Sequence, residues 1–254
     1  MSQASPSGSG QDIVTAALIV IGDEILSGRT KDRNIGFVAD HLTAIGIQLR
    51  EVRIVPDEEA EIVDAVNALR RRYDYVFTTG GIGPTHDDIT ADAVAKAFGV
   101  GIDVDERALG PMREHFQRRG VELTPARMRM ARIPFGAELV ENRISIAPGF
   151  MLGNVIVMAG IPAIMQVMLE AATRFLKTGK RMESFALDLH RPEGEIADMF
   201  AALQKRYPDV PMGSYPFQKD GKPGTQLVLR STDPARLEAA RAELEAELSA
   251  RGWR

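Results

Sequence analysis

The segment Thr79–Thr85 has the residue types of an anion-binding turn. Glycines occupy three of four successive positions, where they adopt positive φ readily and leave backbone N–H groups unshielded by a Cβ atom. A helix predicted to be capped by Thr90 follows, and its first N–H groups add partial positive charge. The segment lacks the Gly-Lys-Ser/Thr of a P-loop and the dinucleotide-binding fingerprint. Its composition therefore favours binding of a phosphate by backbone amides.

Two adjacent carboxylates, Asp87 and Asp88, follow this turn. Carboxylates beside an anion cradle favour a bound cation, because Mg²⁺ takes one or two carboxylates, keeps several waters and bridges to phosphate oxygens. Neighbouring side chains diverge, so we expect only one of the two to face the ligand. The alternative is that both aspartates simply precede and cap the next helix.

Acidic residues also follow the first two predicted strands. Asp23 and Glu24 belong to the segment Gly22–Gly28, and Asp57 comes directly after the second strand. Ligands of open parallel sheets bind at the carboxyl ends of strands. Three successive strand ends with acidic residues therefore favour a metal-assisted site. Taken alone, Gly22–Gly28 is equally well an ordinary polar loop, and Asp57 has the position of a helix N-cap.

The elements that position these segments alternate between strand and helix. Continuous apolar runs predict buried strands, and apolar residues at helical spacing predict the helices between them. The predicted strands are Ala16–Ile21, Gln48–Val55, Tyr75–Thr79 and Val155–Ala159; the predicted helices span 35–42, 62–69, 91–98, 105–119, 124–131 and 164–171. Gly99 is predicted to end the helix at 91–98. This alternation predicts an α/β fold with a mostly parallel sheet covered on both faces.

Beyond Thr178–Lys180 the pattern changes to that of a small α+β unit. Strands are predicted at 184–189, 210–215 and 226–230, with helices at 193–206 and 236–250. We therefore predict a flexible tail at 1–12, an α/β domain at 13–177 and a small α+β domain at 181–254.

Composition narrows the classes of function. The net charge of −4 provides no general attraction to nucleic acid or anionic membranes, so we expect neither as a partner. There are no cysteines and no apolar run of membrane-spanning length, which predicts a soluble, cytoplasmic protein. Arg70–Arg72 and the group Arg127, Arg129 and Arg132 are predicted to be solvated helix faces. One arginine of the second group could still reach a phosphate from a neighbouring subunit.

In order, Gly22–Gly28, Asn34, Thr79–Thr85 and Asp87–Thr90 resemble the motifs of the molybdopterin-binding domain family, over about 16–176. The resemblance is to the N-terminal region of competence/damage-inducible protein A and to molybdopterin adenylyltransferases. The small C-terminal unit resembles the second domain of the former protein.

This resemblance implies a three-layer α/β fold, a site at the strand ends and a homo-oligomer, either dimer or trimer. It implies that Asp57 and Asp88 are catalytic and bind Mg²⁺ or another divalent cation, with molybdopterin as one candidate ligand. The residues implied to bind substrate are Gly22, Asp23, Glu24, Ser27, Asn34, Thr79, Gly80, Gly81, Gly83, Pro84, Thr85, Asp87, Pro148, Gly149, Gly160 and Pro162.

Two positions depart from the family pattern. Ser145 stands where the family usually has glycine after Asn142, and Ile164 stands where it commonly has glutamate. Both changes concern the substrate side. The function expected is metal-dependent phosphoanhydride chemistry, either adenylylation of a pterin phosphate or pyrophosphate hydrolysis in an ADP-ribose-type nucleotide. The alternative is a non-catalytic module that binds a pterin or nucleotide.

Overall fold

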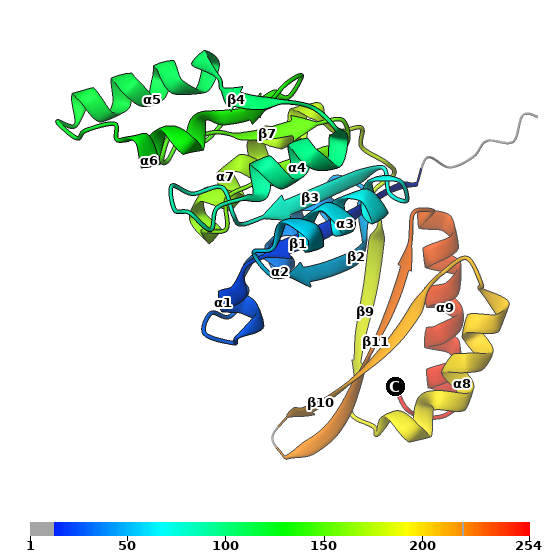
Figure 1. Cartoon of the computed structure of the whole chain (residues 1–254). Coiled ribbons are helices and arrows are strands. Elements are labelled where there is room, and N and C mark those ends of the chain that lie inside the picture. The colour runs from blue at the N-terminus through cyan, green and yellow to red at the C-terminus, as the bar shows by residue number, and fades with distance from the viewer. Residues whose placement is uncertain (1–12, 220) are drawn as a thin grey trace, which may run out of the picture. The chain divides into compact units, whose positions relative to one another are not determined.

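The computed structural model describes residues 13–219 and 221–254, so the tail predicted at 1–12 lies outside the described residues. The chain divides into two compact units between Gly179 and Lys180. Figure 1 traces an α/β unit before this point and a smaller unit after it.

The first unit is built on a six-stranded sheet with the order β2-β1-β3-β8-β7-β6. The first four strands in this order are parallel, while β7 is antiparallel to both of its neighbours. The strand bounds are β1 Val14–Ile21, β2 Ile47–Val55, β3 Tyr75–Thr79, β6 Glu138–Val140, β7 Gly149–Leu152 and β8 Val155–Met158. The mostly parallel sheet confirms the predicted α/β fold class.

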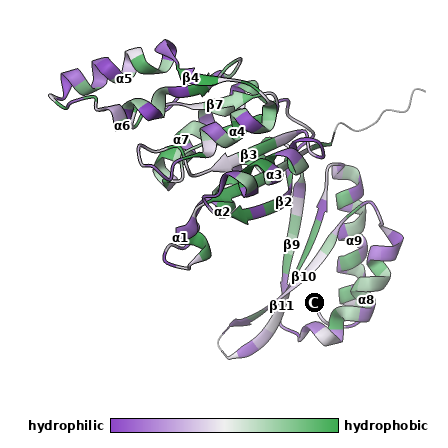
Figure 2. Cartoon of the chain, in the orientation of Figure 1, coloured by the Kyte–Doolittle hydropathy of each residue, from purple (hydrophilic) through white to green (hydrophobic). Residues whose placement is uncertain are grey.

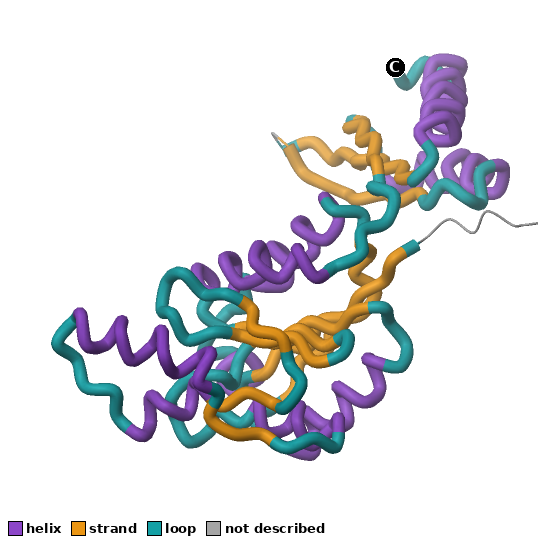
Figure 3. Tube along the Cα trace, turned by 90° about the horizontal axis from the view of Figure 1, so that it is seen from above, coloured by secondary structure: helices purple, strands orange, loops and turns teal. Residues whose placement is uncertain are grey.

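Helices cover both faces of this sheet and make three layers (Figure 3). Helices α3 (Glu59–Arg70), α4 (Thr90–Phe98) and α5 (Glu106–Arg118) contribute to one core, and α2 (Asn34–Ala44) and α7 (Pro162–Ala172) to the other. Alternate residues of β1 point into opposite cores, and all of its residues from Ala16 onward are buried. Burial on both faces explains the continuous apolar run in its sequence.

Short elements complete the first unit. They are α1 (Asp23–Leu26), β4 (Ile102–Val104), α6 (Pro125–Met128), the 3₁₀ helix η1 (Arg129–Ala131), β5 (Arg132–Pro134) and the 3₁₀ helix η2 (Thr173–Phe175). Strands β4 and β5 pair with each other as a separate antiparallel ribbon. The sequence did not predict β4, β5, β6 or β7, because three or four residues are too few to display a periodic pattern.

Two predicted helix caps are wrong. Asp57 does not cap α3, whose N-cap is Glu58, and its carboxylate instead accepts a hydrogen bond from the amide of Asp23. Thr90 is the first residue of α4 and not its cap, and its buried hydroxyl donates to the carbonyl of Gly80. The predicted end of α4 is confirmed, since Gly99 is left-handed with φ 67°.

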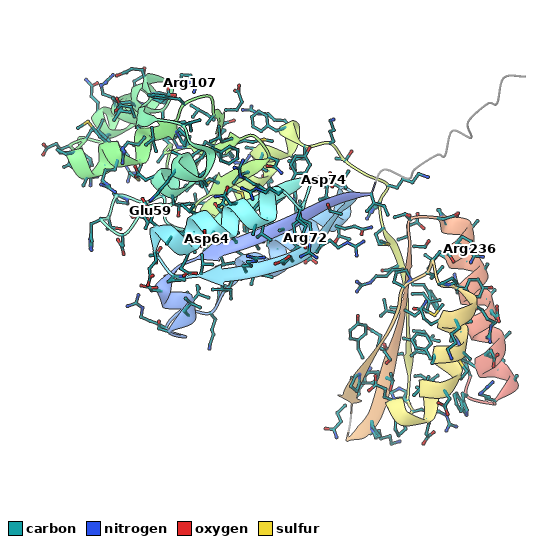
Figure 4. All side chains as sticks on the ribbon, turned by 45° about the vertical axis from the view of Figure 1, so that its right-hand side comes forward. Glu59, Asp64, Arg72, Asp74, Arg107 and Arg236 are labelled. Carbon is teal, nitrogen blue, oxygen red and sulfur yellow. The ribbon has the colours of Figure 1, made fainter. Side chains whose placement is uncertain are left out.

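The second unit has a three-stranded antiparallel sheet in the order β10-β11-β9. Its elements are β9 (Glu183–Leu189), α8 (Glu193–Arg206), β10 (Met212–Lys219), β11 (Lys222–Ser231) and α9 (Pro234–Ala250). Leu227 and Leu229 of β11 share a core with both helices. The Asp233 carboxylate caps α9, and Arg236 (labelled in Figure 4) forms an ion pair with Asp209 at 2.6 Å.

The helices carry apolar stripes and not continuous apolar surfaces, as the mixed colouring of α8 and α9 in Figure 2 illustrates. In α9 the buried residues Leu237, Ala240, Leu244 and Leu248 recur at helical spacing, which is typical of a helix packed on one side. Among the described residues, no helix combines the length and the apolarity needed to cross a bilayer.

Candidate functional site

The four parallel strands end at one edge of the sheet. Ile21 at the end of β1 is in register with Val55 of β2, and Thr79 of β3 is in register with both Val20 and Met158. The loops that leave these strands therefore begin side by side. This alignment brings together the segments that the sequence singled out: the turn after β3, the acidic residues after β1 and β2, and the Gly160 turn after β8.

The turn after β3 requires glycine at two positions. Gly80 and Gly81 have φ 104° and 66°, which side-chain-bearing residues rarely adopt. A Cβ on Gly80 would overlap the carbonyl oxygen of Ile21, and one on Gly81 would overlap the hydroxyl of Thr90. Thr90 fastens the turn, because its amide donates to Gly81 O at 3.0 Å and its hydroxyl to Gly80 O at 3.0 Å.

Asp88 organises the rest of the turn. Its Oδ1 accepts from the amide of Gly83 at 2.6 Å, and its Oδ2 accepts from the amide of Thr85 at 2.8 Å and from the Thr85 hydroxyl. The half-buried carboxylate is thus turned into the loop and away from bulk solvent. The amides of Gly83 and Thr85, which the sequence suggested as phosphate donors, therefore donate to Asp88 instead. The hydrogen bonds of the described residues leave the amides of Gly81 and Ile82 without a protein acceptor.

The acidic groups at this edge are poorly compensated. Asp57 Oδ2 accepts from the Asp23 amide at 3.0 Å. Burial raises the pKa of Asp57, the hydrogen bond from the Asp23 amide opposes this rise, and the carboxylates of Asp23, Glu24 and Asp87 raise the pKa further. Asp87 differs, because a hydrogen bond from Thr85 lowers its pKa. Within residues 13–219 and 221–254, no lysine, arginine or histidine forms an ion pair with any of these four carboxylates.

This donor set fits a hard divalent cation, because such an ion prefers oxygen ligands and neutralises clustered carboxylates. In the described part of the chain, no three Asp, Glu or His side chains are grouped closely enough to hold a metal ion by themselves. The fit is therefore to an ion held by one or two carboxylates, with the remaining positions left to water and ligand.

Two buried asparagine side chains, Asn34 and Asn142, hold other loops near the strand ends. Asn34 Nδ2 donates to Gly160 O at 2.8 Å, and Gly160 packs against Gly80 so closely that a Cβ would lie 3.3 Å from its Cα. Asn142 folds the loop before β7, since its Nδ2 donates to Ser145 Oγ at 2.6 Å and Ala147 O at 2.8 Å. These contacts fix two loops at the edge of the site.

The loops enclose a cavity of about 540 Å³. The predicted site residues that line it are Gly22, Glu24, Asp57, Gly80, Gly81, Gly83, Pro84, Asp87, Asp88, Gly160 and Pro162. Three other lining residues were already noted in the sequence: Ile82 lies within the predicted turn, and Ser145 and Ile164 are the two departures expected on the substrate side. The lining residues that the sequence did not assign to the site are Ile21, Thr30, Met130, Asn142, Ala147, Ala159, Ile161 and Met168. Asn142–Ala147 carries a signal that could have found some of them, since the segment precedes a Pro-Gly turn and contains Ser145.

The remaining predicted residues lie outside the lining. Asp23, Thr85 and Asn34 act on lining residues through the hydrogen bonds described above. Thr79 is fully buried in β3, and Ser27 is exposed after α1. Pro148 lines a small cavity behind the turn, and Gly149 begins β7, where a Cβ would overlap the carbonyl oxygen of Val157.

A three-layer α/β fold with a glycine turn, acidic loops and a cavity at the parallel strand ends defines the class of this protein. The family model described as "Probable molybdopterin binding domain" matches residues 17–178. The chain belongs to this molybdopterin-binding domain family, which confirms the resemblance seen in its motifs. A second model, "FAD synthase, middle domain", matches residues 181–253.

Individual proteins support the same assignment. A crystal structure of the protein CinA, of unknown function, from Thermoplasma acidophilum superposes on this chain with a TM-score of 0.59 and a sequence identity of 36%. The match covers 64% of this chain and 98% of that one. A protein of Aeropyrum pernix is 34% identical over 238 residues, 90% of this chain and 88% of its own length. A protein of Pyrobaculum arsenaticum is 36% identical over 210 residues, 79% of each chain.

Proposed function

We propose that this protein binds a phosphorylated pterin or nucleotide in the strand-end cavity and carries out phosphoanhydride chemistry that depends on Mg²⁺ or another divalent cation. The reaction is either adenylylation of a pterin phosphate or hydrolysis of the pyrophosphate in an ADP-ribose-type nucleotide. The observation that carries this proposal is that Gly81 and Ile82, whose amides have no protein acceptor among the described residues, line the same cavity as Asp57, whose carboxylate has no ion-pair partner there.

The residues divide between the anion and the cation. The amides of Gly81 and Ile82 donate to phosphate oxygens, and the cavity excludes part of the solvent around them. Asp57 and Asp88 are the carboxylates that would hold the divalent cation. When bound, such a cation withdraws charge from the phosphate oxygens and so stabilises the transition state of phosphoryl or nucleotidyl transfer. One acceptor site of Asp88 remains for the cation, on Oδ1, because Oδ2 already accepts two hydrogen bonds and Oδ1 only one.

The apolar side of the cavity suits a planar ring. Ile82, Met130, Ile161, Ile164 and Met168 all line it, and Ile161 is 62% exposed. Covering these groups with a pterin or adenine ring removes apolar surface from water, which favours binding by about 25 cal/mol per Å² covered.

A non-catalytic binding module is the second candidate. Two observations favour it: Ile164 provides no polar group on the substrate side, and the Asp88 carboxylate already accepts three hydrogen bonds from its own loop. This candidate predicts ligand binding without product.

The experiment that tests the proposal incubates the purified protein with ADP-ribose, with FAD, or with molybdopterin plus ATP. Mg²⁺, Mn²⁺ or EDTA is added, and products are identified by liquid chromatography and mass spectrometry. We expect turnover of one substrate that EDTA abolishes and that Asp57→Asn lowers about a hundredfold or more. Asp64→Asn is the matched control, since Asp64 is exposed on α3 (Figure 4) and lies outside the cavity.

Substrate binding without any product would support the second candidate, whereas neither binding nor product would refute both. A cytoplasmic location and a homo-oligomer, either dimer or trimer, complete the proposal. Cell fractionation and light scattering coupled to size-exclusion chromatography test these two points.

A further inference from the structure

The three arginines of the α6–β5 segment have different environments. Arg127 donates to the carbonyl of Glu122 and lies 5.1 Å from the centre of the Phe116 ring. Arg132 forms an ion pair with Asp92 at 2.7 Å. Arg129 has no such partner: within the described residues its guanidinium makes a single hydrogen bond, a long one of 3.4 Å to the carbonyl of Asp88.

The Arg129 guanidinium is therefore poorly satisfied. Its Nε is buried and has no acceptor. A guanidinium carries five N–H donors and stays charged in proteins. Arg129 as a whole is half-buried, so only part of this charged group is withdrawn from water, and a nearby anion would compensate that part.

The location of Arg129 identifies that anion. Arg129 lines a small cavity on the far side of the glycine turn from the strand-end cavity. The two cavities share the lining residues Gly81, Ile82, Gly83, Asp88 and Met130, so only the turn and Met130 separate them. Gly81 and Ile82, whose amides have no protein acceptor among the described residues, belong to this shared wall.

We propose that Arg129 is an electrostatic positioning residue for the phosphate group bound at the amides of Gly81 and Ile82; this inference rests on the proposed function. The strand-end cavity is lined by Glu24, Asp57 and other carboxylates, which repel a phosphate. Arg129 supplies a positive charge in the small cavity that Gly81 and Ile82 also line. Asp88 and Asp92 also line the small cavity, but among the described residues neither forms an ion pair with Arg129, whereas Arg132 is paired with Asp92.

Opposite effects of one substitution on folding stability and on anion affinity distinguish this role from a role in packing alone. Removing a half-buried charge that has no ion-pair partner leaves folding stability unchanged or improves it, whereas removing the attraction weakens anion binding. Arg129→Met should therefore keep or raise the melting temperature and weaken the binding of inorganic pyrophosphate and ADP-ribose by about 10- to 100-fold. Arg129→Lys, which keeps the charge, should restore much of the lost affinity.

The experiment measures both dissociation constants by isothermal titration calorimetry at low and high salt, and the melting temperature by calorimetry, for the full chain. Arg127→Met is the matched control and should bind within twofold of wild type. Affinity of Arg129→Met should also depend less on salt than that of wild type, because one charge–charge attraction is gone.

Three outcomes separate the inference from the proposed function. If wild type binds and Arg129→Met binds equally well, or if its affinity and melting temperature fall together and Arg129→Lys does not rescue them, the inference is overturned alone. If binding changes as expected and no turnover exists, the inference stands and only the enzymatic proposal fails. If wild type binds neither probe, the inference is overturned together with the ADP-ribose branch of the proposed function, and the pterin branch is decided by the turnover assay with molybdopterin and ATP.

Discussion

Replacing Thr90 by valine tests how the glycine turn is held. Thr90 is fully buried at the start of α4, and its hydroxyl donates to Gly80 O at 3.0 Å. Thr79, also fully buried, stands one residue before Gly80, and its hydroxyl has no hydrogen-bond partner among the described residues. Thr90→Val and Thr79→Val thus make the same chemical change in equally buried places, one with a hydrogen bond to lose and one without.

The magnitudes follow from the hydrogen bonds. Thr90→Val removes a bond worth a net of about 0.5–1.5 kcal/mol and withdraws a donor from the Gly80 carbonyl, so we expect a loss of about 1–3 kcal/mol in the free energy of unfolding. Thr79→Val removes a buried hydroxyl that pairs with nothing, so we expect no loss and a gain of up to about 1 kcal/mol.

Differential scanning calorimetry of the full chain measures the effect. In a domain of this size, about 1 kcal/mol corresponds to about 2–4 °C, so Thr90→Val should melt about 2–12 °C below wild type and Thr79→Val at or slightly above it. Equal losses for the two variants would show that valine is rejected by packing, and the assignment of the Thr90 hydroxyl to the turn would be wrong.

Other substitutions test further parts of the structure. Burial lowers the pKa of His41 below 6.5, although the negative charge of Glu170 opposes this. Because His41 takes up a proton more readily in the unfolded chain, the free energy of unfolding should fall as pH drops below about 6.5. In His41→Gln, the urea midpoint of unfolding should lose this pH dependence. Gly81→Ala should cost at least about 1 kcal/mol more than Gly28→Ala in urea unfolding, because both have positive φ but only the former Cβ overlaps another atom. Asp233→Ala should cost about 0.5–2 kcal/mol in thermal melts, because its carboxylate accepts from two amides at the start of α9.

Local patterns predicted the central sheet well, because β1 and β3 are buried on both faces and nearly every residue in them must be apolar. They also predicted where the turn and the acidic loops lie, since strand order and the rules for parallel sheets bring strand ends together. The short strands β4 to β7 depend on pairing between distant segments, which leaves no periodic trace in three or four residues.

Contacts beyond the immediate sequence account for what the local patterns did not predict. Asp57 and Thr90 have the local signature of helix caps, yet Asp57 bonds to the loop after β1 and Thr90 bonds back to Gly80 at the start of its own loop. Likewise, Met130 enters the cavity from a segment that only the tertiary fold brings near the glycine turn. No spacing rule within a single segment could have related Met130 to the turn.

The most direct test of the central claim is a crystal structure with a slowly hydrolysed ADP-ribose analogue and Mn²⁺, whose anomalous signal locates the cation. The account predicts phosphate oxygens within about 3 Å of the amides of Gly81 and Ile82, and a cation in contact with the carboxylate of Asp57. A ligand bound with its phosphates away from both amides, or a cation that contacts neither Asp57 nor Asp88, would contradict it.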